Sequence, residues 1–206
     1  MGIVIEYQYF PPSILFKSLC PATHLLFEQY ESFQKMSFRN RLMIAGAGGS
    51  ILLSVPLQQG RNQKSLTKDI RVENRTTWQA AHWKTIVSCY NKSPWFEYYR
   101  DELDHLYNKR QEFLVDWNLS CFRWISDKLN IDVAVSLTAE WNEFYDVENW
   151  DDWRSRLSPG SICEKFPSAP KYRQVFEERT GFIPHLSILD LLFCEGKNAL
   201  NTVGEQ

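Results

Sequence analysis

The chain lacks any apolar run that approaches the roughly 18 residues needed to span a bilayer. The N-terminal stretch MGIVIEYQYF has no basic segment ahead of a long apolar one, so we expect no secretory signal peptide. The five cysteines are odd in number and scattered, and no two have the C-x-x-C spacing of a zinc or redox site. These absences predict a soluble, cytoplasmic protein with no metal and no other cofactor.

The sequence also has no excess of positive charge. It carries 23 Lys and Arg against 25 Asp and Glu, a formal net charge of −2. This balance argues against a nucleic-acid partner, which requires a broad basic surface. The 206 residues include 13 Phe, 9 Tyr and 8 Trp, enough to build a core. We therefore expect a single domain over residues 1–206, in an oligomeric state that the sequence leaves open.

Short apolar segments in the first third of the chain predict five β-strands. The Gly-rich turn AGAGGS joins the third and fourth as a hairpin, and it lacks the Lys-Ser/Thr of a phosphate-binding loop. The segments are 3–7 (IVIEY), 25–30 (LLFEQY), 33–44 (FQKMSFRNRLMI), 51–57 (ILLSVPL) and 68–74 (KDIRVEN).

The middle of the chain changes to the three- and four-residue period of helices. Thr77 and the Ser93-Pro94 pair are typical helix starts, and Asn130, Gly181 and Gly196 are typical ends. The predicted helices cover 78–90, a segment after Pro94, 110–129, 171–181 and a final segment after Ser187, with a sixth strand at 131–137.

Residues 138–169 mix Trp with acidic residues, Gly and Pro, and they predict a loop-rich excursion with one short helix around WDDWRSRL. The overall order of strands followed by helices predicts an α/β fold. We expect a single mixed sheet of about five to six strands, with the N-terminal strands and the central helical block packed against it.

A strand over 33–44 would carry Lys35, Arg39 and Arg41 on one face and Asn40 on the other. Such cations can be a solvated face that protects a sheet edge. Alternatively they form the floor of an anion-binding pocket, because Arg binds phosphate and carboxylate in a bidentate manner and Asn40 adds an amide. In the second interpretation, Arg39→Ala abolishes binding at a stability cost within about 1 kcal/mol, as at a surface site.

Three further side chains, one imidazole and two carboxyls, are candidates for general acid or base catalysis. His82 lies on the apolar side of its predicted helix, where it is either a satisfied core residue or a general acid or base. Glu28 and Glu31 precede the basic segment, where they either pair with Lys35 or Arg39 or act as a carboxylate base.

Ser187 and Asp190 have the spacing of a capping box at the start of the last helix. A site role for Asp190 is the alternative, since helix N-termini also attract anionic ligands.

Five segments together resemble the WbqC-like proteins, most closely the shorter members of that family. They are YFPP, SFRNR, SVPLQQG, WQAAHWKTIVSCYNKSPWFEYY and GFIPHLSILDLLFCEG. The chain departs from the longer members in three places. Glu6-Tyr7 stands where they have Gln-Pro, Gln29-Tyr30 stands at an acidic pair, and His185 stands where Asn is common.

The resemblance implies a link to O-antigen and other surface polysaccharides, for which transfer of glycine or an aminoacyl group to sugars has been suggested. It favours a transferase that acts on an anionic small molecule, such as an acyl, aminoacyl or nucleotide-sugar donor. His82 and Glu31 would be catalytic, and Lys35, Arg39, Asn40, Arg41 and Asp190 would bind substrate. The alternative is a non-catalytic interaction module that docks a partner through exposed Trp and Tyr in 138–169.

Overall fold

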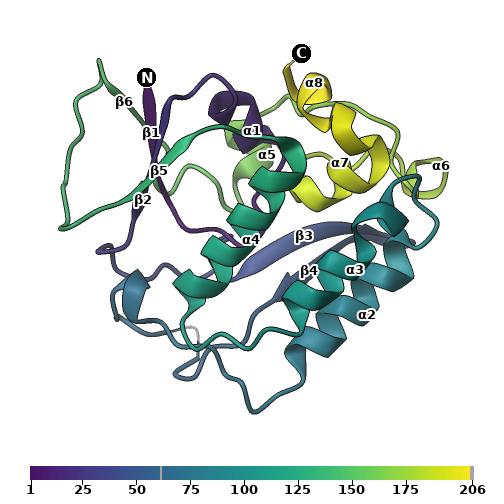
Figure 1. Cartoon of the computed structure of the whole chain (residues 1–206), viewed down its shortest axis with the longest axis horizontal. Coiled ribbons are helices and arrows are strands. Elements are labelled where there is room, and N and C mark those ends of the chain that lie inside the picture. Colours follow the sequence, from purple (N-terminus) through teal and green to yellow (C-terminus); the bar gives the residue numbers. More distant parts are fainter. Residues whose placement is uncertain (61, 205–206) are drawn as a thin grey trace.

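A computed structural model describes residues 1–60 and 62–204. The strands form two separate sheets (Figure 1). The mixed α/β composition predicted from the sequence is confirmed, but the single sheet of five to six strands is wrong. The first sheet has the order β5–β2–β1–β6, with β1 at Gly2–Glu6, β2 at His24–Glu28, β5 at Ala134–Leu137 and β6 at Trp150–Asp152. The second is an antiparallel hairpin of β3 (Arg41–Gly46) and β4 (Gly49–Ser54).

Every strand pair of the first sheet is parallel. A parallel pair needs a crossover, and helix α1 (Ile14–Leu19) supplies it between β1 and β2. All five residues of β1 are buried, as expected for the centre of a parallel sheet that is covered on both faces. The register runs from Gly2 opposite His24 to Glu6 opposite Glu28, so the two strands end at the same level.

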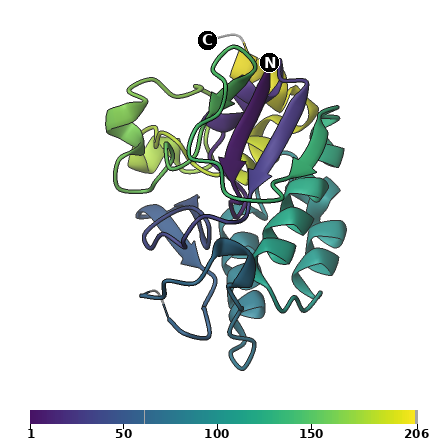
Figure 2. The same cartoon turned by 90° about the vertical axis from the view of Figure 1, so that its left-hand side faces the viewer.

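Helices pack against both sheets. The ring of Phe122 on α4 (Leu114–Leu129) lies 5.2 Å from that of Phe27 on β2. Strand β3 contacts α2 (Trp78–Tyr90) on one side and α7 (Ile188–Glu195) on the other, as Figure 1 shows. In Figure 2, the segment after β6 lies on one side of the parallel strands, and α3 (Phe96–Tyr107) and α4 lie on the other. The remaining elements are short: η1 (Thr67–Asp69), α5 (Ile162–Lys165), α6 (Glu177–Thr180), η2 (Gly196–Asn198) and α8 (Ala199–Gly204).

The predicted strand over 33–44 is wrong in its first part, because β3 begins at Arg41. Residues 33–40 form turns instead. The Ser37 hydroxyl donates to the Gln34 carbonyl, 2.7 Å away, and Met36 has a left-handed φ of 61°. Such local side-chain bonds compete with strand pairing, so the alternating faces assumed for Lys35 and Arg39 do not exist.

Three other predictions of secondary structure are corrected. The segment 68–74 forms η1 and isolated bridges in place of a fifth strand. No helix forms over 150–157, where Trp150–Asp152 is strand β6 and the Asp152 carboxylate accepts the backbone N–H of Arg154 in a turn. The helix predicted at 171–181 is limited to Glu177–Thr180.

The long central helices are confirmed. Helix α2 has the predicted bounds, α4 ends where predicted but begins four residues later, and α3 begins at Phe96, two residues after Pro94. Asn130 ends α4 with φ 52° and ψ 45°, the left-handed conformation expected of a terminating Asn. Strand β5 lies within the predicted 131–137. Among the helices described, none combines the length and apolar character required to cross a membrane.

Gly196 ends α7 at a position where a side chain does not fit. Its φ is 58°, and a Cβ there would overlap the indole ring of Trp95. We expect Gly196→Ala to lower the free energy of unfolding by about 2–4 kcal/mol, from the left-handed backbone and the overpacking together. Urea denaturation measures this, and Gly160→Ala is the control because, apart from its chain neighbours, nothing lies within 4 Å of a Cβ at Gly160. Equal stability of the two variants would contradict the packing described here.

Candidate functional site at the carboxyl end of the parallel sheet

The strand order places a crevice at the carboxyl ends of β1 and β6. The chain passes from β1 to β2 and then to β5 on one side of β1, whereas β6 pairs with the other side. The segments that follow β1 and β6 therefore diverge. In open α/β sheets, ligands bind at such a point, outside the carboxyl ends of the strands.

Two glutamates lie side by side at this edge. Glu6 ends β1, Glu28 ends β2, and the two are register partners in the parallel pair. Both side chains are fully buried. The strands that carry them lie about 5 Å apart, and two buried carboxylates on neighbouring strands repel each other unless cations compensate them.

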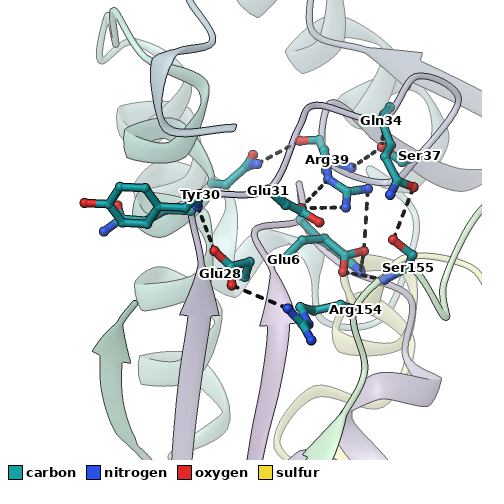
Figure 3. Close-up of polar contacts among 12 residues, drawn as sticks. Glu6, Glu28, Tyr30, Glu31, Gln34, Ser37, Arg39, Arg154 and Ser155 are labelled. Atoms are coloured by element: carbon teal, nitrogen blue, oxygen red, sulfur yellow. Dashed lines mark hydrogen bonds and ion pairs between the residues drawn. The ribbon is translucent and has the colours of Figure 1, made fainter. Parts of the chain in front are cut away.

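Arg39 is the first compensating cation. Its Nε donates to Glu31 Oε1 at 2.8 Å and its Nη2 lies 2.6 Å from the same oxygen. Its Nη1 lies 3.9 Å from Glu6 Oε1. The side chain is only 1% exposed, and Figure 3 shows Glu6 and Glu31 turned toward its guanidinium. The anion that Arg39 faces is thus a pair of the protein's own carboxyl groups.

Arg154 is the second cation, and it comes from the turn after β6. Its Nη1 lies 3.6 Å from Glu28 Oε2, and its Nε and Nη2 bind both oxygens of Asp152 at 3.0 and 2.6 Å. The guanidinium lies 4.7 Å from the ring centre of Trp141 and 4.8 Å from that of Tyr145. Its remaining N–H groups donate to backbone carbonyls of residues 142 and 143.

Two backbone N–H groups and one hydroxyl complete this cluster. The backbone N–H of Ser155 donates to Glu6 Oε2 at 2.9 Å, and that of Tyr30 donates to Glu28 Oε1 at 2.7 Å (Figure 3). The Thr138 hydroxyl donates to Glu28 Oε1 at 3.1 Å. These bonds fasten the segments after β1, β2, β5 and β6 to one another.

A cavity of ≈ 620 Å³ opens beside the cluster. Its walls combine carboxyl groups, aromatic rings, one guanidinium and small polar groups, a composition typical of small-molecule sites. The lining residues are Tyr30, Glu31, Ser32, Phe33, Gln34, Trp141, Glu143, Asp152, Arg154 and Ser155.

Glu31 connects the cluster to the cavity. The pKa of its carboxyl is raised from 4.5 to about 7, mainly by burial; Arg39 opposes this shift, and Glu6 and Glu28 add to it. Burial disfavours the charged form and the single guanidinium of Arg39 compensates it only in part, so the carboxyl holds a proton close to neutral pH. Both contacts with Arg39 end on Oε1, and no hydrogen bond from the described residues ends on Oε2. A carboxyl with this pKa and one available oxygen can accept or donate a proton.

Of the residues proposed from the sequence, the structure brings Glu31 and Arg39 together at this site. Lys35 is exposed and lies 3.4 Å from the Asn62 amide oxygen. The Asn40 amide donates to the Val55 carbonyl at 2.9 Å and so fastens the start of the hairpin. Arg41 is half-buried opposite Ser54 in β3–β4. The three cations therefore do not share one face.

His82 lies in a different part of the core. Its Nδ1 is 3.1 Å from the Tyr9 hydroxyl, which in turn bonds to the Tyr107 hydroxyl. The ring also bonds to the Ser54 backbone, but burial dominates and lowers the pKa of His82 to about 4. The imidazole is therefore neutral at pH 7 and fully engaged within the core, and it does not line the cavity described above.

Asp190 belongs to a third polar cluster. The hydroxyls of Tyr90 and Tyr172 donate to its two oxygens, each at 2.6 Å. Burial raises the pKa of Asp190 to about 6, although both hydroxyls oppose this shift. Ser187 caps α7 through the Leu189 backbone N–H, as predicted, whereas the Asp190 carboxyl serves the tyrosines.

The sequence did not identify Glu6, Asp152 or Arg154 as site residues, and Trp141 was considered only as part of a docking surface. One signal was available: the apolar runs IVIE and LLFE each end in glutamate, and parallel pairing of two such strands makes the carboxyls neighbours. The contribution of Arg154 required knowledge of β6, which is too short to show a pattern. Within residues 1–60 and 62–204, no group of His, Cys, Asp and Glu is arranged to hold a metal ion.

Comparison with known families gives one match. A model of the WbqC-like protein family matches residues 7–157, a stretch that includes every residue lining the cavity. The comparisons with curated proteins and with solved structures found no match.

The buried position of Arg39 reverses the stability expectation drawn from the sequence. We expect Arg39→Ala to lower the free energy of unfolding by about 3–5 kcal/mol, because it leaves buried carboxyls without their cation. Lys35→Ala, at an exposed position, is expected to cost within about 0.5 kcal/mol. Chemical denaturation of both variants measures the difference, and a cost within about 1 kcal/mol for Arg39→Ala would refute the buried ion pair.

The raised pKa of Glu31 predicts a pH dependence of stability. An acid whose pKa is higher in the folded than in the unfolded state holds more protons when folded, so stability falls as pH rises through that window. Between pH 4.5 and about 7, the wild type should lose roughly 2–3 kcal/mol relative to Glu31→Gln. Asp190 and His82 titrate in both proteins and cancel in the difference. Parallel curves from urea denaturation across this range would show that Glu31 has an ordinary pKa.

Proposed function

Because this chain belongs to the WbqC-like protein family, we propose that it is a transferase of surface-polysaccharide or cell-envelope metabolism with its active site in the cavity beside Glu31. Two lines support the proposal. The family resemblance implies a link to polysaccharides, and the cavity lies where ligands bind in open α/β sheets. The single observation that carries it is the Glu31 carboxyl, with a pKa of about 7 and one oxygen available to a ligand.

Glu31 acts as a general base in this proposal. As a hydroxyl or amine of the acceptor forms its new bond to the transferred group, Glu31 Oε2 takes the proton that the acceptor loses. The bond between the transferred group and the donor breaks, and the leaving group departs with its electron pair. A base with a pKa near the working pH is efficient because it is partly ionised and still basic.

Arg39 is a positioning residue in this scheme. Its two contacts fix Glu31 Oε1, which orients the other oxygen, and its charge keeps the pKa of the carboxyl from rising further. The rest of the cluster holds Arg39 in place through Glu6. We assign the cavity to the acceptor, because the guanidinium that lines it, Arg154, already binds Asp152, Glu28 and two carbonyls. The anionic donor proposed from the sequence would then bind at the open side of the cavity, next to the acceptor.

A non-catalytic interaction module is the second candidate. The segment after β5 exposes apolar side chains, with Phe144 82% and Val147 83% accessible, and Trp141 is half exposed. Exposed apolar groups gathered on one loop are typical of docking surfaces.

Genetic complementation tests the transferase proposal. Deletion of the gene should change the composition or mass of the cell's surface polysaccharide, as measured by mass spectrometry of the isolated glycan. Wild type and Lys35→Ala should restore it. Glu31→Gln should not, because the amide keeps the shape and accepts a bond from Arg39 but cannot take a proton; we expect at least about a hundredfold loss of activity.

Protein levels of each variant are measured in the same cells, so that loss of folding is not mistaken for loss of catalysis. Full restoration by Glu31→Gln at normal levels would refute the catalytic role. Loss of restoration by Phe144→Ser in that case would favour the interaction module.

A further inference from the structure

The walls of the cavity carry more negative than positive charge. Glu31, Glu143 and Asp152 line it, and Glu6 and Glu28 lie directly behind Glu31 and Arg154. The compensating cations in this cluster are Arg39 and Arg154. Five carboxyl groups thus stand against two guanidinium groups, and one proton on Glu31 does not remove the imbalance. A cavity lined with one sign of charge concentrates ligands of the opposite sign.

Neither guanidinium is available to an anionic ligand. Arg39 is 1% exposed and is held by Glu31 and Glu6. Arg154 lines the cavity, but Asp152, Glu28 and the carbonyls of residues 142 and 143 occupy its donors. A phosphate or carboxylate in the cavity would meet the carboxyl groups without gaining a new cation.

One carboxyl oxygen at the wall of the cavity is open to a ligand. Glu31 is 5% exposed and lines the cavity, and its Oε2 accepts no hydrogen bond from the described residues. Unlike Glu28 Oε2, this oxygen is not buried without a hydrogen-bond partner, so it is open to the cavity and can accept a hydrogen bond from a ligand. An ammonium group offers three donors and a positive charge, which match both the geometry and the charge deficit.

The aromatic walls are compatible with a cation as well. Trp141 is half exposed, and its ring already lies 4.7 Å from the guanidinium of Arg154. Tyr30 and Phe33 add further ring surface to the cavity. Indole and phenyl faces attract cations, and they also stack on the apolar faces of a sugar ring.

We infer that this cavity recognises its acceptor through a protonated primary amine, which donates to Glu31 Oε2 while the ring that bears it packs against Trp141. When the acceptor reacts, the hydrogen-bonded proton passes to Glu31 and the freed lone pair of the nitrogen forms the new bond. The second proton that this nitrogen loses departs with the leaving group of the donor. The acceptor class is therefore an amino sugar with a free amine. The inference rests on the proposed function in assigning the cavity to the acceptor. Glu143, at the rim, adds negative charge without contacting Arg39.

Binding is tested with matched sugars in the absence of any donor. Glucosamine and galactosamine are compared with their N-acetyl derivatives by isothermal titration calorimetry at pH 7. The N-acetyl sugars keep the ring but lose the charge. We expect saturable binding of at least one amine, about tenfold or more tighter than its N-acetyl partner, because a charge-assisted hydrogen bond is replaced by a neutral contact.

Variants locate the binding. Glu143→Gln removes one charge from the rim and should weaken the amine several-fold, whereas Glu148→Gln removes an exposed charge outside the cavity and should leave affinity unchanged. Trp141→Ala should weaken amine binding as well. Both Glu variants alter exposed side chains, so both are expected to fold.

Equal or tighter binding of the N-acetyl sugars, or no saturable binding of either amine, would overturn the inference. So would equal effects of Glu143→Gln and Glu148→Gln. These binding results are independent of the complementation experiment. If the amine preference is absent and Glu31→Gln fails to complement, only the acceptor class is overturned. If the amine binds as expected and Glu31→Gln complements fully, only the catalytic role of Glu31 is overturned.

Discussion

The buried pair of Glu6 and Glu28 is the constraint on which the rest of this structure depends. Parallel pairing of β1 with β2 fixes the two carboxyls side by side, away from water. Neither strand carries a cation that could compensate them. Arg39 reaches them from the turns before β3 and Arg154 from the turn after β6, so two segments 115 positions apart in sequence are drawn to one sheet edge.

The need to compensate Glu6 and Glu28 also explains how the loop after β5 is held in place. Residues 139–149 contribute few buried side chains, yet Arg154 stacks on Trp141 and Tyr145 and binds two backbone carbonyls of the segment. The loop is therefore fastened by a cation whose own position is set by Glu28 and Asp152. The cavity beside Glu31 lies between this loop and the turn after β2, so the ion pairs that stabilise the fold also shape the site.

The sequence predicted the parts of the fold that depend on local signals. Helices α2, α3 and α4 follow from apolar periodicity over twelve or more residues and from clear end signals such as Asn130. It did not predict that two sheets form, because strand pairing depends on contacts between distant residues. Strand β6 has three residues, two of them Asp, and shows no apolar alternation. The alternation in 33–44 was misleading, since a hydrogen bond between Ser37 and Gln34 and the left-handed Met36 turn the chain there.

The same limit applies to the site. Glu31 and Arg39 were proposed from their residue types and proximity in sequence, and they do meet. Their chemistry depends on how deeply they are buried. Glu6 and the surrounding loops bury them, and the amino-acid composition does not predict this. His82 and Asp190 were equally reasonable candidates by residue type, but each forms its own hydrogen-bonded network in the core.

The raised pKa of Glu31 follows mainly from burial, which its one cation, Arg39, offsets only in part. Glu6, Glu28, Glu31 and Asp152 share Arg39 and Arg154, and the cluster offsets part of the deficit by retaining a proton on the carboxyl nearest the cavity. A third buried Arg would stabilise the cluster but would lower the pKa of Glu31 and remove its capacity to exchange a proton at neutral pH. In the function proposed above, reduced stability at this sheet edge is the condition for a carboxyl that exchanges protons, a trade-off common at functional sites. A cationic ligand that replaces the proton restores the charge balance only while it is bound, which couples recognition to the ionisation of Glu31.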